Sequence, residues 1–218
     1  MGKENEKSYC ILYLVRHGET EWNVKHITQG QSESFLTETG IKQAEETAEK
    51  LKDIKFDAIF SSDLSRTQRT AEIIKLDREI IIQTSELLRE RSYGSFEKRH
   101  ADEFKNTLKD KLKERDNQSS DDKYRSFRLA PDVETDEELM TRFINQLREI
   151  SVAYPNKTVL VVTHAGCIKN FIIKTGYMER KTSPEWYFKH AGYVKVLSDG
   201  IDFLIKEVEG IKKIEGVN

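Results

Sequence analysis

Two uninterrupted apolar runs constrain the fold of this chain more than any other feature. The run Tyr9–Val15 stops abruptly at Arg16-His17-Gly18, and the run Val159–Val162 stops at Thr163-His164-Ala165-Gly166. Strands that are apolar on both faces are typical of a parallel sheet with helices on either side. The two runs therefore predict two buried strands, each followed at once by a polar segment that contains a histidine.

Helix and strand patterns alternate along the rest of the chain. The spacing of apolar residues predicts helices at 41–51, 64–75 and 168–175. A capping box, Thr135 with Glu138, predicts the start of a further helix. Shorter apolar runs predict additional strands at 57–60, 79–83, 194–197 and 201–205. We therefore expect an α/β fold, a three-layer α/β/α sandwich around a mostly parallel, doubly wound sheet.

One stretch, 98–131, interrupts this alternation. It is densely charged, and one weakly amphipathic helix places Phe104, Leu108 and Leu112 on a single face. Its charge favours a solvated surface insertion, but a small cap over a binding site is the alternative. We expect a single domain at 9–208 that contains this insertion, with a polar N-terminal tail at 1–8 and a C-terminal tail at 209–218.

Composition limits the classes of partner. Charged residues make up 34% of the chain, but its net charge is only -2. A general nucleic-acid binder would carry a strong basic excess, so we expect no nucleic-acid partner. The apolar run near the start is far shorter than a membrane span, and the leader before it is too polar for a signal peptide. Cys10 and Cys167 stand in apolar surroundings, which suggests a reducing compartment. We expect a cytoplasmic protein with no membrane partner.

The expected fold gathers several polar side chains at one edge of the sheet. Ligands of doubly wound sheets bind at the carboxyl ends of the strands, beside helix N-termini that favour anions. Arg16 and His17 follow the first strand, Arg66 follows the second, and His164 follows the fourth. A neutral imidazole is able to attack phosphorus, and a guanidinium group matches the oxygens of a phosphate. A carboxylic acid is then needed to protonate the leaving oxygen. The pattern favours phosphoryl transfer.

Five segments resemble, in the right order, motifs of the histidine phosphatase (phosphoglycerate mutase-like) superfamily. The first, LVRHGETEWN at 14–23, closely resembles its phosphohistidine signature. The others lie at 29–40, 61–67, 88–94 and 162–166, so the resemblance covers nearly the whole chain. The segment 88–94 is similar to sugar-phosphate phosphatases of the fructose-2,6-bisphosphatase type as well as to the mutases.

The resemblance implies a role for each matching residue. His17 would be the nucleophile, with Arg16, Arg66 and His164 completing the phosphate pocket, and Glu90 would be the proton donor. The expected substrate contacts are Asn23, Thr20, Gln29, Gly30, Arg91, Tyr93 and Ala165. The resemblance implies a metal-independent reaction without a cofactor, and the sequence contains no zinc-type ligand spacing.

Several residues near these motifs have competing interpretations. Glu86 and Glu97 compete with Glu90 for the role of proton donor. Arg69 is interpreted as a solvated helix residue, and Cys167 is expected to pack beneath the site without chemistry. The remaining histidines are interpreted as surface residues: His26, His100 and His190.

The reaction expected from the resemblance is hydrolysis of a small phosphorylated metabolite. One alternative is a 2,3-bisphosphoglycerate-dependent phosphoglycerate mutase, and another is a weakly active domain that binds a phosphorylated ligand. Phosphatase is favoured because Glu90 and His164 lie close together in sequence for a mutase. The paired arginines of the mutases are also replaced by Arg125 and Arg128, which are not adjacent. The sequence predicts neither the particular ester nor the oligomeric state.

Overall fold

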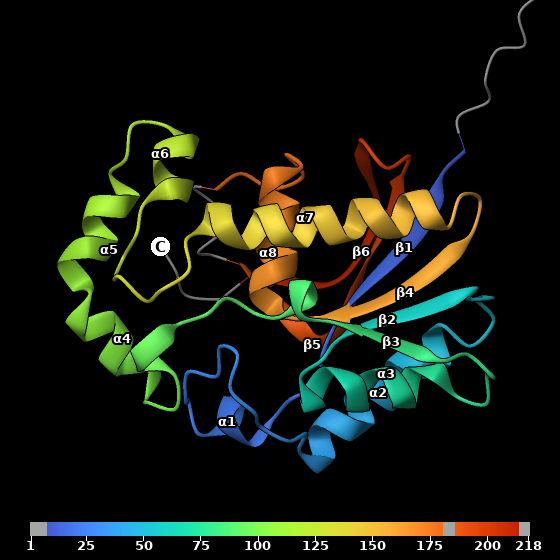
Figure 1. The fold of residues 1–218 in the computed structure, drawn as a ribbon. Coiled ribbons are helices and arrows are strands. Elements are labelled where there is room, and N and C mark those ends of the chain that lie inside the picture. Colours follow the sequence, from blue (N-terminus) through green and yellow to red (C-terminus); the bar gives the residue numbers. More distant parts are fainter. Residues whose placement is uncertain (1–7, 181–185, 214–218) are drawn as a thin grey trace, which may run out of the picture.

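The computed structural model describes residues 8–180 and 186–213. Within these residues, six strands form one sheet in the order β3-β2-β4-β1-β5-β6 (Figure 1). The first four strands run parallel to one another: β1 (Cys10–Arg16), β2 (Ala58–Ser62), β3 (Ile82–Ser85) and β4 (Thr158–Thr163). The last two, β5 (Trp186–Ser198) and β6 (Phe203–Lys213), are antiparallel. The predicted α/β fold with a mostly parallel sheet is confirmed.

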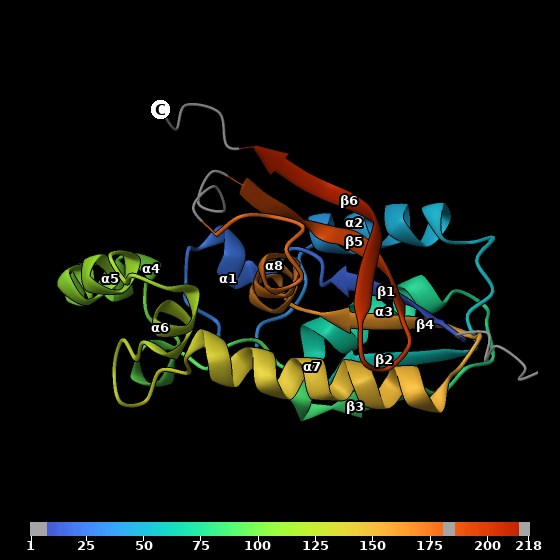
Figure 2. The ribbon, with the colours of Figure 1, turned by 90° about the horizontal axis from the view of Figure 1, so that it is seen from above.

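Helices cover both faces of this sheet. Helices α2 (Glu38–Lys50) and α3 (Ser65–Lys75) lie on one face, and α7 (Asp136–Ala153) and α8 (Ala165–Lys174) lie on the other (Figures 1 and 2). The central strand β1 explains the three layers because its side chains alternate in direction. Leu12 and Leu14 join the apolar cluster of α7 and α8, whereas Tyr13 and Val15 join the cluster of α2 and α3.

Pairing between β1 and β4 brings the two predicted histidines together. The parallel register places Arg16 opposite Thr163, so the residues that follow leave the sheet at the same edge. The His17 amide donates to the Thr163 carbonyl at 3.0 Å. The imidazole rings of His17 and His164 then meet at a centroid distance of 5.2 Å. The carboxyl edge of the sheet therefore carries both histidines, as the sequence predicted.

Some element boundaries differ from the predicted ones. The third strand begins at Ile82 and not at 79, because its parallel register with β2 begins at that residue, opposite Ile59. Strands β5 and β6 are longer than the predicted hairpin, and Glu209 still pairs with Tyr193. Pairing along the sheet thus extends β6 to Lys213, past the predicted domain end at 208. The rest of the predicted C-terminal tail, 214–218, and residues 1–7 of the N-terminal tail lie outside the described residues.

The charged stretch 98–131, called the cap below, folds into short helices beside the carboxyl edge of the sheet (Figures 1 and 2). The single helix expected there is broken at Leu108, which separates α4 (Ala101–Thr107) from α5 (Lys109–Asp116), and α6 (Asp121–Ser126) follows. Leu108 and Leu129 are buried against Phe96. The cap therefore shares a small apolar cluster with flanking residues such as Phe96 and Val133, which distinguishes it from a fully solvated insertion.

Candidate active site

A cavity of about 720 Å³ lies between the carboxyl edge of the sheet, α8 and the cap. The predicted residues that line it are Arg16, His17, Asn23, Gln29, Gly30, Arg66, Glu90, Arg91, Tyr93 and Ala165. Cap residues such as Phe104, Leu112 and Tyr124 line the same cavity. These contacts favour the cap interpretation of 98–131 over the solvated insertion.

His17 is held in one tautomer by its own loop. Its Nδ1 lies 2.7 Å from the Gly18 carbonyl oxygen, and the imidazole is 4% exposed. Because a carbonyl only accepts hydrogen bonds, Nδ1 must carry the proton and Nε2 must be the unprotonated nitrogen. Burial, followed by the charges of Arg66 and Arg16, lowers the pKa of His17 well below its usual value. The imidazole is therefore neutral, as a nucleophile requires.

Two buried guanidinium groups flank this imidazole. Arg66 donates to the carbonyls of Ser32 at 2.8 Å and Gly30 at 2.7 Å, and it is only 1% exposed. Arg16 donates to the Phe188 carbonyl. In both arginines the Nε–H is buried without a partner among the described residues. Such a donor costs about 1–3 kcal/mol when it stays unpaired, so each is suited to an anionic ligand atom.

His164 is fully buried at the end of β4, and both of its ring nitrogens lack a partner within the described part of the chain. Burial lowers its pKa well below the usual value, and the charge of Arg66 adds to this effect. A structural core histidine would have its hydrogen bonds satisfied. The ring does not line the cavity itself but packs edge-on against His17, which does.

The carboxylate of Glu90 is fixed by backbone amides on both of its oxygens. Oε1 accepts from the Arg91 amide at 2.8 Å, and Oε2 accepts from the Gly166 amide at 2.9 Å. Of the three glutamates that competed for the acid role, this is the one that lines the cavity. The carboxylate of Glu97 instead binds the Gln31 and Tyr93 amides, both at 3.0 Å, and the side chain of Glu86 is 74% exposed.

Thr20 and Asn23 form a local structural unit. The Thr20 hydroxyl is the N-cap of α1 (Glu21–Val24), and the Asn23 side chain binds the Thr20 amide at 3.1 Å. Thr20 does not line the cavity, because its hydroxyl satisfies a free amide of the helix, and its expected contact with the substrate stays a prediction. Asn23 does line the cavity. Gln29 presents a buried Oε1 without a partner among the described residues.

Arg91 and Tyr93 form the wall between Glu90 and the cap. The Arg91 guanidinium is paired with the buried carboxylate of Asp136, which the sequence did not identify as part of the cavity. The Tyr93 ring meets Phe104 edge to face at 5.2 Å. Burial raises the pKa of Tyr93 to about 12, so its phenol remains a hydrogen-bond donor at neutral pH.

His190 is a site neighbour that the sequence analysis assigned to the surface. Its Nε2 lies 2.8 Å from Arg16 Nη2, and because guanidinium only donates, this imidazole is neutral and accepts the bond. Burial, together with Arg16, lowers its pKa to about 3. His190 lies within β5, where the strand's register with β6 shifts between Phe188 and Tyr193. His26, His100 and Arg69 are exposed, and Cys167 is buried beneath the Arg89 carbonyl, all as predicted.

Cationic side chains dominate the outer part of the cavity. Six of them line it beyond Arg16, Arg66 and Arg91: Lys105, Arg115, Arg125, Lys169, Lys174 and Arg180. The two carboxylates that line it, Glu90 and Asp136, are both held by hydrogen bonds. The guanidinium groups of Arg115 and Arg180 both lie over the Tyr124 ring, at 4.6 and 4.3 Å from its centroid. Three of the six cations are paired with aspartates outside the lining: Arg115 with Asp116, Arg125 with Asp122 and Arg180 with Asp121. The lining itself still carries more cationic side chains than carboxylates.

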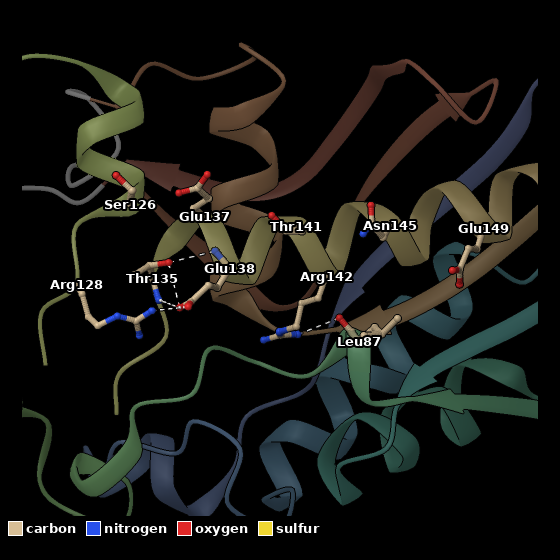
Figure 3. Close-up of a pocket in the computed structure, with 10 residues that line it drawn as sticks. All are labelled: Leu87, Ser126, Arg128, Thr135, Glu137, Glu138, Thr141, Arg142, Asn145 and Glu149. Atoms are coloured by element: carbon tan, nitrogen blue, oxygen red, sulfur yellow. Dashed lines mark hydrogen bonds and ion pairs between the residues drawn. The ribbon is translucent and has the colours of Figure 1, made fainter. Parts of the chain in front are cut away.

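A second cavity, of about 590 Å³, lies on the outer side of α7 (Figure 3). Its lining includes the carboxylates of Glu137, Glu138 and Glu149, and its Arg128 is paired with Glu138. Unneutralised carboxylates repel a phosphate, so this surface is not suited to an anionic substrate.

Within the described ranges, no group of three or more histidine, cysteine, aspartate or glutamate side chains is arranged to hold a metal ion. None of the described helices is long and apolar enough to cross a membrane.

Known proteins resemble the chain over most of its length. A family model, the histidine phosphatase superfamily (branch 1), matches residues 12–209. The uncharacterized phosphatase PhoE of Bacillus subtilis strain 168 is 39% identical over 155 residues, or 71% of this chain and 72% of that protein. The probable phosphoglycerate mutase GpmB of Cronobacter sakazakii is 35% identical over 174 residues, or 78% of each protein. The structure of a phosphoglycerate mutase from Bacillus anthracis strain Sterne has a TM-score of 0.80 at 26% identity, covering 94% of this chain and 95% of that one. With the phosphohistidine motif at the carboxyl edge of a matching fold, this chain belongs to the histidine phosphatase superfamily.

Proposed function

We propose that the protein is a phosphatase that hydrolyses small phosphate monoesters through a phosphohistidine on His17. The observation that carries this proposal is the bond from His17 Nδ1 to the Gly18 carbonyl, which leaves Nε2 as the nucleophilic nitrogen. The Nε–H groups of Arg16 and Arg66, which are buried and have no partner in the described part of the chain, would supply donors for the transferring phosphoryl group.

The first chemical step transfers the phosphoryl group to the enzyme. Nε2 of His17 forms the N–P bond while the ester P–O bond breaks, and the leaving oxygen takes the proton of Glu90. In the second step a water molecule gives a proton to the Glu90 carboxylate as its oxygen attacks phosphorus. The N–P bond then breaks, and its electron pair returns to Nε2. The bound phosphoryl group is negatively charged and offsets the positive charge of the arginines near His164. This favours a hydrogen bond donated by the His164 ring to a phosphoryl oxygen.

The outer cavity supports a substrate whose alcohol part is itself acidic. Lys105 and Lys169 line the cavity beyond the phosphate end, and Lys169 is partly buried, which lowers its pKa. A substrate anion there would recover part of that desolvation cost. We infer a small acidic phosphorylated metabolite in a cytoplasmic setting, with neither nucleic acid nor membrane as a partner. The finer resemblance to fructose-2,6-bisphosphatases stays a prediction.

The covalent step has a direct test. Wild-type enzyme incubated with a ³²P-labelled ester should trap an acid-labile, base-stable adduct, and His17→Ala should abolish both the adduct and turnover. His26→Ala, an exposed histidine outside the cavity, is the matched control and should retain both. Hydrolysis should persist in excess chelator, because the proposed steps use only side chains. Label on a serine, aspartate or cysteine would show that the nucleophile is wrong.

The proton donor is tested by changing the leaving group. Glu90→Gln should slow hydrolysis of an alkyl phosphate by roughly 10²–10⁴-fold, because the alkoxide leaves poorly without a proton. The loss on p-nitrophenyl phosphate should be much smaller, since nitrophenolate leaves unaided. Equal losses on both esters would move the acid elsewhere.

The cationic outer cavity also keeps the mutase alternative open, because a bisphosphate needs positive groups at both ends. The assay that separates the two functions supplies 3-phosphoglycerate with a catalytic amount of 2,3-bisphosphoglycerate. A phosphatase releases free phosphate faster than it forms 2-phosphoglycerate. The opposite result would replace the phosphatase assignment with the mutase. Binding of phosphate esters without either product would indicate the weakly active binding domain.

A further inference from the structure

The loop that carries Glu90 has an unusual means of support. Residues 89–93 have no regular secondary structure, although Glu90, Arg91 and Tyr93 among them line the cavity. The loop is half-buried, so most of its backbone carbonyls need hydrogen-bond partners within the protein. Four consecutive carbonyls, from Leu87 to Glu90, accept hydrogen bonds from side chains of other elements. The loop is therefore held by tertiary contacts and not by strand pairing.

Three of those four carbonyls bind a single side chain, Arg142 of α7. Its Nη1 donates to Leu87 at 2.9 Å and to Arg89 at 2.6 Å, and its Nη2 donates to Glu90 at 2.8 Å. Figure 3 shows the Arg142 side chain pointing from α7 toward this loop, with its bond to Leu87. The remaining carbonyl, that of Leu88, accepts from the Thr163 hydroxyl at 2.8 Å.

The guanidinium group is itself anchored by Glu134. Arg142 Nε donates to Oε1 of Glu134 at 2.7 Å, and Nη2 donates to Oε2 at 2.9 Å. With three bonds to carbonyls and two to Glu134, every one of the five N–H donors of the guanidinium is used. The side chains of Arg142 and Glu134 are only 16% and 13% exposed. A lysine has three donors on one atom and is unable to reproduce this planar set.

The same pair holds the loop on the other side of Glu90. Oε2 of Glu134 accepts from the Ser92 amide at 3.1 Å, and the Glu134 amide donates to the Ser92 carbonyl at 2.9 Å. The backbone is thus fixed at 87, 89, 90 and 92, on both sides of the carboxylate. Arg142 does not line the main cavity, so it does not touch the substrate.

We propose that Arg142 is a positioning residue which, anchored by Glu134, holds the 87–92 loop so that the Glu90 carboxyl reaches the leaving oxygen. This inference rests on the proposed function, in which Glu90 donates the proton. It goes beyond that function because it places the control of the proton transfer in an ion pair outside the cavity. A shift of the carboxyl by about 1 Å suffices to slow proton transfer strongly.

The test measures kcat on two esters. Arg142→Lys keeps the positive charge but loses the five-donor fork, and it should slow glycerol 2-phosphate hydrolysis by roughly 10–10²-fold, which is part of the roughly 10²–10⁴-fold that general acid catalysis contributes. Its effect on p-nitrophenyl phosphate should stay within about threefold, because that leaving group needs no proton. Arg148→Lys, on the same helix but with a single 3.4 Å bond to Ile201, is the matched control and should leave both rates unchanged.

A double variant separates positioning from a merely structural role. If Arg142 acts through Glu90, Glu90→Gln/Arg142→Lys should hydrolyse glycerol 2-phosphate no more slowly than Glu90→Gln alone. Multiplied losses in the double variant, or equal losses of Arg142→Lys on both esters, would overturn the proposal. If Arg142→Lys does not fold, Glu134→Gln weakens the same anchor and should also lose more activity on glycerol 2-phosphate than on p-nitrophenyl phosphate. Equal losses of Glu134→Gln on the two esters would overturn the proposal as well. The Glu90→Gln variant decides separately whether Glu90 is the acid. If Glu90→Gln loses more activity on glycerol 2-phosphate than on p-nitrophenyl phosphate, but Arg142→Lys does not, the positioning role is rejected and the proposed function is kept.

Discussion

Glycine at position 166 allows the closest approach between α8 and the Glu90 carboxylate. A Cβ on Gly166 would lie 2.2 Å from Glu90 Oε1, much closer than van der Waals contact allows. The group it would strike is the end of a flexible side chain, which is able to move aside. Gly18 differs, because a Cβ there would lie 2.3 Å from the backbone carbonyl oxygen of Gly40. Two glycines of the same motif set thus have different neighbours: Gly166 lies against the carboxylate of the proposed acid, and Gly18 lies against the backbone of α2.

Gly166→Ala is therefore expected to reduce activity while leaving the fold intact. The methyl group displaces the Glu90 carboxylate from its amide bond, so hydrolysis of an alkyl phosphate should fall at least tenfold, within the roughly 10²–10⁴-fold contribution of a general acid. Alanine favours a helix over glycine by about 1 kcal/mol, so the melting temperature should not decrease. Gly18→Ala should instead lower it sharply. Steady-state kinetics and thermal melts of both variants check the contrast, which fails if Gly166→Ala keeps wild-type rates.

Helix α7 connects the cavity, the cap and the loop of Glu90. It contributes Asp136 to the pair with Arg91 and Arg142 to the loop carbonyls, so its first turns must be well ordered. Its start is fixed by the capping box, in which Thr135 Oγ1 accepts from the Glu138 amide at 3.1 Å and Glu138 binds the Thr135 amide at 2.9 Å. The local sequence therefore sets where the helix begins, and this boundary places the side chains that follow.

Loss of this cap should destabilise the protein measurably. Thr135→Ala removes the side-chain acceptor for the Glu138 amide, and we expect the free energy of unfolding to decrease by about 1 kcal/mol, with a range of about 0.5–2. Thr141→Ala, an exposed position within the same helix, is the control. It should be neutral or slightly stabilising because alanine is the better helix former. Urea denaturation of the three proteins gives the comparison, and equal stabilities would contradict the capping role.

At the scale of the whole molecule, burial of three imidazoles links stability to pH. The pKa of His17, His164 and His190 is lowered by burial first and by neighbouring arginines second. These rings stay neutral in the folded chain but take up protons in the unfolded chain below its pKa of about 6.5. Because the unfolded state binds more protons, the free energy of unfolding rises with pH up to about 6.5–7 and falls on acidification.

His190→Asn should weaken this dependence. Asparagine still presents an acceptor to Arg16 but does not titrate, so the slope of unfolding free energy between about pH 5 and 6.5 should decrease by at most about 1.4 kcal/mol per pH unit. The comparison variant is His26→Asn, at an exposed position. Denaturant unfolding at several pH values measures the slopes. A slope in His190→Asn as steep as that of the wild type would show that His190 is not held neutral in the folded chain.

The sequence by itself determined the central strands, the positions of the two motif histidines and the gathering of the proposed catalytic residues at one edge of the sheet. Apolar runs and helical spacing are local patterns, and they indicate burial directly. The rule that parallel strands present their carboxyl ends together then brings His17, Arg66 and His164 near one another without further information. The capping box at Thr135 is local in the same way, and it was predicted at the correct residue.

Only the tertiary structure decided which other residues reach the site. His190 lies 174 positions from Arg16, the cap closes on the cavity through Phe104 and Leu112, and Thr20 turns away to cap α1. Arg142 reaches a loop more than 50 positions away, as the separations of 55, 53 and 52 residues show. Contacts at such separations depend on how elements pack and on where strand pairing ends, and no local periodicity encodes them.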